Sequence, residues 1–309
     1  MKFDMFSFCL IPQPFIMNSM RCVLGIGSRS VSRTLQQKYL FVNSVWKSAH
    51  TQTAEEPLTL TTQNNGIRTI CLNDPKKRNA LSLAMLNALY HDLTRDPDDV
   101  RVIILKGAGP VFCAGHDLKE LTGLENRSTH EKIFSMCTNV MNVIQDLPVP
   151  VISQVNGLAT AAGCQLVATS DIAVVSENSR FATPGVNVGL FCTTPGVALG
   201  RSVPRKVALE MLFTGHPISA HDALLHGLVS KVVPDQYVED ETMRIAERIC
   251  DTSKQVIALG KASFYAQMAL EKKNAYRFAE KIMVENLGLD DGQEGIGAFI
   301  QKRKPEWTK

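Results

Sequence analysis

Acidic residues are missing from a long stretch at the N-terminus. No Asp or Glu occurs between Asp4 and Glu55, whereas serine recurs and residues 1–53 carry six basic side chains, Lys2, Arg21, Arg29, Arg33, Lys38 and Lys47. A basic, serine-rich and acid-poor segment is typical of a mitochondrial transit peptide. We therefore expect residues 1–53 to be a transit peptide, with a merely disordered segment as the alternative. The mature protein is then expected in the mitochondrial matrix.

The rest of the chain lacks an excess of positive charge. Residues 54–309 contain 27 basic and 29 acidic side chains, so the net charge of +3 comes from the N-terminal segment. A nucleic-acid-binding surface requires clustered positive charge on a folded element, and we expect no nucleic-acid partner. Apolar residues make up 45% of the chain, which is ordinary for a globular protein with a large core.

Paired cysteines and a membrane span are also missing. The eight cysteines include no C-x-x-C pair, which argues against a zinc site and a disulfide framework and predicts buried free thiols and no metal. Residues 147–170 carry no charge, but they contain Pro148, Pro150, Asn156 and Gly157. Because a lipid-facing helix does not tolerate so many breakers and amides, we predict a buried strand, a turn and a short helix here.

Hydrophobic periodicity predicts alternating strands and helices. Strands are expected at 58–62 and 66–72, joined by a hairpin turn at Asn64-Asn65-Gly66, and a helix follows at 82–95 with Ser82 as its N-cap. Further elements are expected as strand 100–105, helix 131–147, strand 149–155, helix 161–168, strand 171–175, strand 228–233 and helices 239–250, 254–270 and 274–287. This order predicts an α/β fold with a layered sheet in residues 54–203 and a mainly helical region in residues 204–309.

Three segments, 72–81, 112–121 and 155–164, place small residues where a helix begins after a strand or loop. Free backbone N–H groups at such positions donate hydrogen bonds, and the helix dipole favours negative charge there. Small side chains let a ligand approach the backbone closely. Two such turns converging on one point would form an oxyanion hole.

In their order and spacing, these segments resemble those of the crotonase (enoyl-CoA hydratase/isomerase) family, from about residue 57 to the C-terminus. The runs Ser219-Ala220-His221-Asp222-Ala223 and Glu294–Phe299 are also similar to that family. The resemblance implies a spiral of ββα turns with C-terminal helices that build trimers, often paired into hexamers. It also implies a role in fatty-acid metabolism and an acyl-CoA thioester as ligand, with no other cofactor.

The resemblance assigns the oxyanion hole to the backbone N–H groups of His116 and Ala162. It places five further residues in the acyl-CoA site, Lys76, Ala114, Asp117, Lys119 and Lys302, and the lysines are the ones expected near the CoA nucleotide and phosphates. Because oxyanion donors of this family act through the backbone, we expect the His116 ring to point outward or to bond Asp117, with a proton donor to the bound thioester as the alternative.

Hydratases of the family use two glutamates, and this chain has neither. The matching positions hold Gln165 and Gly185, and the aspartate of the dienoyl isomerases is replaced by Thr193. A base or acid contributes about 10²–10⁴-fold to the rate, so we expect thioester binding without efficient hydration. Restoring both glutamates is expected to raise hydration measurably.

Three functions remain open for such a chain, and whether it is an enzyme stays undecided. It is a binding protein with little or no catalysis, a decarboxylase or another lyase or hydrolase that needs only the oxyanion hole, or a structural subunit. The Ala114-Gly115-His116-Asp117 run is similar to methylmalonyl-CoA decarboxylases. Their catalytic tyrosine, however, matches Cys192 in this chain, and they keep the first glutamate.

Overall fold

The structure is a computed structural model of the chain. The structure describes residues 56–123 and 126–308, so the expected transit peptide lies outside the described residues. Among the described helices, none is long and apolar enough to cross a membrane. The uncharged stretch 147–170 instead forms a buried strand, a short strand and a buried helix, as its breakers predict.

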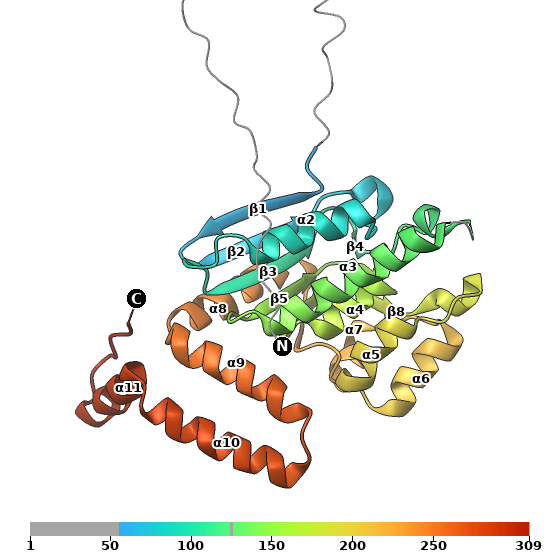
Figure 1. The fold of residues 1–309 in the computed structure, drawn as a ribbon. Coiled ribbons are helices and arrows are strands. Elements are labelled where there is room, and N and C mark those ends of the chain that lie inside the picture. Colours follow the sequence, from blue (N-terminus) through green and yellow to red (C-terminus); the bar gives the residue numbers. More distant parts are fainter. Residues whose placement is uncertain (1–55, 124–125, 309) are drawn as a thin grey trace, which may run out of the picture. The chain divides into compact units, whose positions relative to one another are not determined.

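Two sheets form the framework of residues 56–309 (Figure 1). The first has six strands in the order β1 (Thr59–Asn64), β2 (Ile67–Leu72), β3 (Val102–Gly107), β5 (Val151–Val155), β7 (Ile172–Ser176) and β10 (Lys231–Val233). Its β1–β2 pair is antiparallel and its other pairs are parallel. The second has four short strands in the order β4 (Val111–Cys113), β6 (Leu158–Thr160), β8 (Arg180–Ala182) and β9 (Ile218–Ser219). The predicted α/β fold is confirmed.

Helices cover both faces of the larger sheet, because its strands alternate two sets of apolar side chains. Ile103 and Leu105 pack with α2 (Leu83–Thr94) and α3 (Arg127–Asp146). Val102 and Ile104 face the other way and pack with α8 (Val238–Cys250). Successive strand residues point to opposite faces, so β3 is buried on both sides. This double burial is why its sequence is a continuous apolar run rather than an alternating one.

The predicted elements are found close to their expected bounds. Helix α2 begins after Ser82, whose hydroxyl accepts a hydrogen bond from the Met85 N–H, and its Leu86, Leu89 and Leu93 are buried. The sequence did not predict β4, β6 and β8. The remaining helices are α4 (Ala162–Thr169), α5 (Thr193–Ser202), α6 (Arg205–Thr214), α7 (Ala220–Leu225), α9 (Lys254–Met268), α10 (Lys272–Leu287) and α11 (Asp290–Gln301). Because α5 precedes Pro204, the helical region begins earlier than expected.

A buried lysine attaches α9 to the sheet framework. The ammonium group of Lys261 donates to the carbonyl oxygens of Ile144 and Val149, at 2.7 and 2.9 Å, and to the Asp171 carboxylate at 2.7 Å. The Tyr265 hydroxyl donates to the other oxygen of Asp171 at 2.8 Å. Burial lowers the pKa of Lys261, while the adjacent Asp171 acts in the opposite direction. The lysine therefore joins the end of α3 and the starts of β5 and β7 to α9.

Helices α9, α10 and α11 follow one another at the C-terminal end, and α10 packs against α9 and α11 (Figure 1). No apolar residue of α9 or α10 is buried. Large apolar side chains are exposed along all three helices, among them Phe264, Tyr276, Met283, Val284 and Phe299. Many exposed apolar side chains on neighbouring helices are typical of an interaction site.

The lysine attachment can be tested by Lys261→Met. The substitution leaves the half-buried carboxylate of Asp171 without its cation, and we expect the free energy of unfolding to fall by about 3 kcal/mol. Urea unfolding measures the change. The matched control is Lys281→Met, an exposed lysine of α10, which should change stability by less than about 0.5 kcal/mol. Equal effects of the two substitutions would show that the Lys261 contacts do not stabilise the fold.

Candidate functional site

The segment after β4 and the start of α4 lie against each other with no space for side chains between them. A Cβ atom on Gly115 would lie 2.8 Å from the Cβ of Ala161 and 3.3 Å from the Ala162 nitrogen. A Cβ atom on Gly163 would collide with the carbonyl oxygen of Cys113. Gly115 also has a φ of +88°, which favours glycine. The second and third small-residue segments of the sequence therefore converge, as predicted.

Both expected donors lie at this point of convergence. Ala162 is the first residue of α4, so its N–H has no partner within the helix. Ala161, the N-cap residue, has a φ of +50° and makes no capping bond with its side chain. In the segment of His116, the backbone bonds are Leu81 N–H to the Gly115 oxygen and Ala114 N–H to the Arg78 oxygen. Among the described backbone bonds none uses the N–H of His116.

The first small-residue segment supports the site instead of adding a third donor. Asn79 is fully buried, and its side-chain amide donates to the carbonyl oxygens of Ala108, Val111 and Phe112 at 2.9, 2.8 and 3.2 Å. Its oxygen accepts from the Asp74 N–H at 2.9 Å. One side chain thus fixes the segment that leads into β4 and then to the donors. The sequence analysis missed this function of Asn79.

A cleft of about 470 Å³ opens beside the two donors. Ala114, His116 and Ala162 line it on one side, and its other walls are largely apolar, formed by Leu118, Leu121, Phe134, Val188, Leu190 and Phe191. Three of the apolar residues, Leu118, Val188 and Leu190, are half or more exposed. Apolar walls with a few polar groups are typical of small-molecule sites. The sequence analysis missed these wall residues, because single apolar residues in loops carry no periodic signal.

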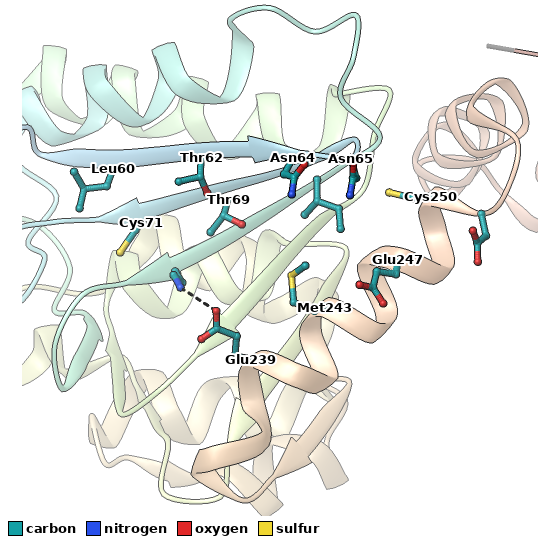
Figure 2. Close-up of a pocket in the computed structure, with 13 residues that line it drawn as sticks. Leu60, Thr62, Asn64, Asn65, Thr69, Cys71, Glu239, Met243, Glu247 and Cys250 are labelled. Atoms are coloured by element: carbon teal, nitrogen blue, oxygen red, sulfur yellow. Dashed lines mark ion pairs between the residues drawn. The ribbon is translucent and has the colours of Figure 1, made fainter.

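A larger hollow of about 740 Å³ lies elsewhere, between β1, β2 and β3 and helix α8 (Figure 2). Figure 2 shows Leu60, Thr62, Thr69 and Cys71 on the strands facing Met243 and Glu247 of the helix. An ion pair of 3.7 Å joins Lys106 and Glu239 across it. The hollow contains none of the expected site residues. We therefore identify the smaller cleft as the candidate site.

The ring of His116 does not point outward or bond Asp117, so that expectation is wrong. Its Nδ1 lies 3.2 Å from the Leu81 carbonyl oxygen, and its ring packs edge-to-face with Phe134 at 5.1 Å between centroids. Its Nε2 is buried and has no hydrogen-bond partner. Burial lowers the pKa of His116, outweighing the opposite effects of the Leu81 carbonyl and Glu120. The imidazole is therefore neutral at pH 7.

The two positions at which hydratases have glutamates differ in the space that they offer to a side chain. Gln165 lies in α4 and is buried, and its Oε1 has no partner. At Gly185, a Cβ atom would lie 2.6 Å from the Leu190 carbonyl oxygen and 2.8 Å from the Cys192 sulfur. A glutamate therefore does not fit at position 185 unless the backbone moves. The expectation that two restored glutamates raise hydration is corrected accordingly. Thr193, exposed at the start of α5, lines the cleft.

Of the five further residues expected in the acyl-CoA site, only Ala114 lines the cleft. Lys76 and Lys119 are exposed in the short helices η1 (Pro75–Lys77) and η2 (Leu118–Leu121). Asp117 accepts a hydrogen bond from the Lys119 N–H at 3.0 Å and pairs with Lys77 at 3.7 Å. It caps η2 and does not line the cleft. Lys302 is exposed at the end of α11 and is not among the residues that line the cleft.

The cysteines near the site are not activated. Burial raises the pKa of the Cys164 thiol to about 12. Burial also raises the pKa of Cys192, which lines the cleft. A thiol is a nucleophile only as its thiolate, so both remain inert at neutral pH, as expected from the sequence. Among the described residues no cluster of potential metal ligands occurs.

Comparison with known proteins gives the same family as the sequence motifs. The family model for enoyl-CoA hydratase/isomerase matches residues 62–309. The mitochondrial enoyl-CoA hydratase domain-containing protein 3 of Xenopus laevis is 60% identical over 282 residues, which cover 91% of this chain and 94% of that protein. The crystal structure of its human counterpart is 61% identical, with a TM-score of 0.80, and covers 82% of this chain and 100% of its own. That of an enoyl-CoA hydratase from Mycobacterium smegmatis is 47% identical, with a TM-score of 0.79, and covers 82% and 99%. The chain belongs to the enoyl-CoA hydratase/isomerase (crotonase) family.

Proposed function

We propose that this protein binds acyl-CoA thioesters through an oxyanion hole formed by the backbone N–H groups of His116 and Ala162, and that it is not an efficient hydratase. The family binds acyl-CoA. Both N–H groups are free of backbone partners, and both residues line the cleft. The dipole of α4 adds to the stabilisation of a developing negative charge at the thioester oxygen.

The observation that carries the second half of the proposal is the lack of space at Gly185. Hydration requires a group that activates water and a group that protonates the carbon next to the thioester. Gln165 does not take a proton, and position 185 does not accommodate a side chain. Both steps therefore lack the residues that perform them in the hydratases of the family.

The cleft favours a neutral, apolar acyl group. No Lys, Arg, Asp or Glu occurs among the described residues that line it. The carboxylate of a malonyl-type thioester would find no cation there, and an unpaired anion against apolar walls is costly. The structure thus offers no support for the decarboxylase alternative. Apart from the CoA thioester, the proposal includes no cofactor.

We further propose that the protein acts in mitochondrial lipid metabolism as a homotrimer or a pair of trimers. The matrix location is supported by the composition of residues 1–53 and by relatives that are named mitochondrial. Self-association is supported by the exposed apolar side chains of α9, α10 and α11. Lys76, Lys119 and Lys302 are proposed to contact the CoA nucleotide and phosphates, where a loosely held positive charge suits a phosphate, and Ala114 and Asp117 are proposed to belong to the substrate site next to His116.

The oxyanion hole is tested with Ala162→Pro. Proline removes the N–H, and the first position of a helix tolerates it well. For the wild type, octanoyl-CoA at a hundred times its dissociation constant should stabilise the fold by about 2.7 kcal/mol, whereas free CoA should give a smaller effect. In the variant the difference between octanoyl-CoA and free CoA should disappear. Thermal unfolding with each ligand measures it.

The control is Lys272→Pro, a proline at the first position of the exposed helix α10. This variant should keep the full difference between octanoyl-CoA and free CoA. A folded Ala162→Pro protein with an unchanged difference would place the thioester elsewhere. No stabilisation of the wild type by any thioester would contradict the binding proposal and favour a purely structural subunit.

The absence of hydratase activity is tested with crotonyl-CoA, by loss of absorbance of the conjugated thioester. Turnover by the wild type should stay far below the ~10 s⁻¹ of an ordinary enzyme. Gln165→Glu should not raise it, because paired groups act as a unit. Gly185→Glu, alone or combined with Gln165→Glu, should not raise it either, since its side chain collides with Leu190. Turnover near ~10 s⁻¹ in any of the four proteins would overturn this conclusion.

The lack of space for a side chain at position 185 can also be tested by a stability measurement, without an activity assay. Gly185→Ala adds only a methyl group, and we expect the free energy of unfolding to fall by about 1–3 kcal/mol because that methyl contacts the Leu190 oxygen and the Cys192 sulfur. Gly200→Ala is the control, because a Cβ atom there meets nothing within 4 Å. A stable Gly185→Ala protein would show that the loop after Gly185 moves aside easily.

Self-association is tested with Val284→Asp. Val284 is 65% exposed on α10, and a charge placed in an apolar interface is costly. Light scattering after size-exclusion chromatography should give a trimer or hexamer for the wild type and a smaller species for the variant. Lys281→Asp, on the exposed surface of the same helix, should leave the assembly intact. A monomeric wild type at micromolar concentration would contradict the proposal.

A further inference from the structure

The imidazole of His116 has a fixed hydrogen-bonding state. Its Nδ1 lies 3.2 Å from the Leu81 carbonyl oxygen, and a carbonyl only accepts hydrogen bonds. Nδ1 of the neutral ring therefore carries the proton, and Nε2 carries a lone pair. This Nε2 has no hydrogen-bond partner within the protein. The ring is thus held as a base and not as an acid.

No other base lines the cleft among the described residues. The lining residues include no Asp, Glu or Lys, and the only other titratable group is the Cys192 thiol. Burial holds that thiol in its neutral form. His116 also supplies one of the two proposed oxyanion donors through its N–H. Base and proposed oxyanion donor are therefore parts of one residue, and that residue lines the cleft.

We infer that the His116 imidazole is a catalytic base that removes the proton from the carbon next to the thioester of a neutral acyl-CoA. This inference rests on the proposed function, because the oxyanion hole must first hold the thioester oxygen. The C–H bond breaks, its electron pair forms the C=C bond of an enolate, and Nε2 receives the proton. The two N–H groups stabilise the negative charge on the enolate oxygen. Return of a proton from the imidazolium restores the thioester, so no other reactant is needed.

The surroundings of Nε2 suit this step better than attack by water. A bound water requires two to four polar partners, and the ring is packed against Phe134. Proton removal from carbon requires only the base and an apolar surface that excludes water. Nε2 is buried in this structure, so the step requires the Phe134 ring, which packs against the imidazole, lines the cleft and is 38% exposed, to move aside when an acyl chain enters.

The test is exchange of hydrogen for deuterium on octanoyl-CoA. The holoprotein is incubated with the thioester in D₂O, and the mass of the acyl group is followed. We expect the wild type to incorporate deuterium at the carbon next to the thioester. Exchange should fall as the pH drops below the pKa of His116, because the imidazolium is no base. Since burial lowers that pKa and Glu120 is the charged group acting against it, the fall should lie below the ordinary value of about 6.5.

Two substitutions separate the ring from the backbone. His116→Asn keeps an N–H group that can donate to the Leu81 oxygen but has no atom in place of Nε2, and His116→Gln has an amide that does not take a proton. Both keep the backbone N–H, so stabilisation by octanoyl-CoA should persist while exchange falls by at least ~10²-fold. His221→Asn, an exposed histidine of α7, is the control and should exchange like the wild type.

The possible failures are distinguishable. If octanoyl-CoA and other thioesters do not stabilise the wild type, the proposed function itself fails. If they stabilise it but no deuterium enters, binding stands and the inference about His116 is wrong. Exchange at the wild-type rate in folded His116→Asn or His116→Gln would likewise overturn it.

Discussion

The backbone that follows β4 lies directly against the first turn of α4, and the rest of the site depends on this close approach. A Cβ atom on Gly163 would collide with the carbonyl oxygen of Cys113. A Cβ atom on Gly115 would come too close to the Cβ of Ala161 and the nitrogen of Ala162. Any side chain at either glycine would separate the two segments. The N–H groups of His116 and Ala162 would then no longer face one point. Because both donors are backbone atoms, their arrangement is independent of the side chains that perform acid–base chemistry.

This independence explains how a site of this family can lack both glutamates and still present the two proposed oxyanion donors. Asn79 fixes the loop before β4 with three amide hydrogen bonds, and Leu81 bonds the Gly115 carbonyl. Neither contact involves Gln165 or Gly185. Substitution at those two positions therefore changes the chemistry of the cleft without changing the geometry of its donors. Binding of a thioester and reaction of that thioester are separable properties of this fold.

The sequence predicted the fold and the convergence of the segments that hold His116 and Ala162, because these depend on local signals. Ser82 marks the start of α2 by its capping hydroxyl, and small residues before α4 mark a close approach. The orientation of the His116 ring was predicted wrongly, since it depends on the carbonyl of Leu81, 35 residues away in the chain. The short strands β4, β6 and β8 were missed, because three residues are too few to show a period of two. Contacts between distant loops leave no pattern in the sequence of either loop.

Gly185 shows how such a distant contact determines chemistry. In the sequence, Gly185 only shows that the glutamate of the hydratases is absent, and a Gly185→Glu substitution would be expected to restore it. In the structure the Leu190 carbonyl and the Cys192 sulfur occupy the space that a side chain would need, so the loop has closed over the position. The cleft consequently has apolar walls, two N–H donors and one imidazole. A neutral base beside an oxyanion hole can move a proton to and from carbon, but it does not supply the second group that addition of water requires. The loss of space at one glycine therefore restricts the site to reactions that a single base performs.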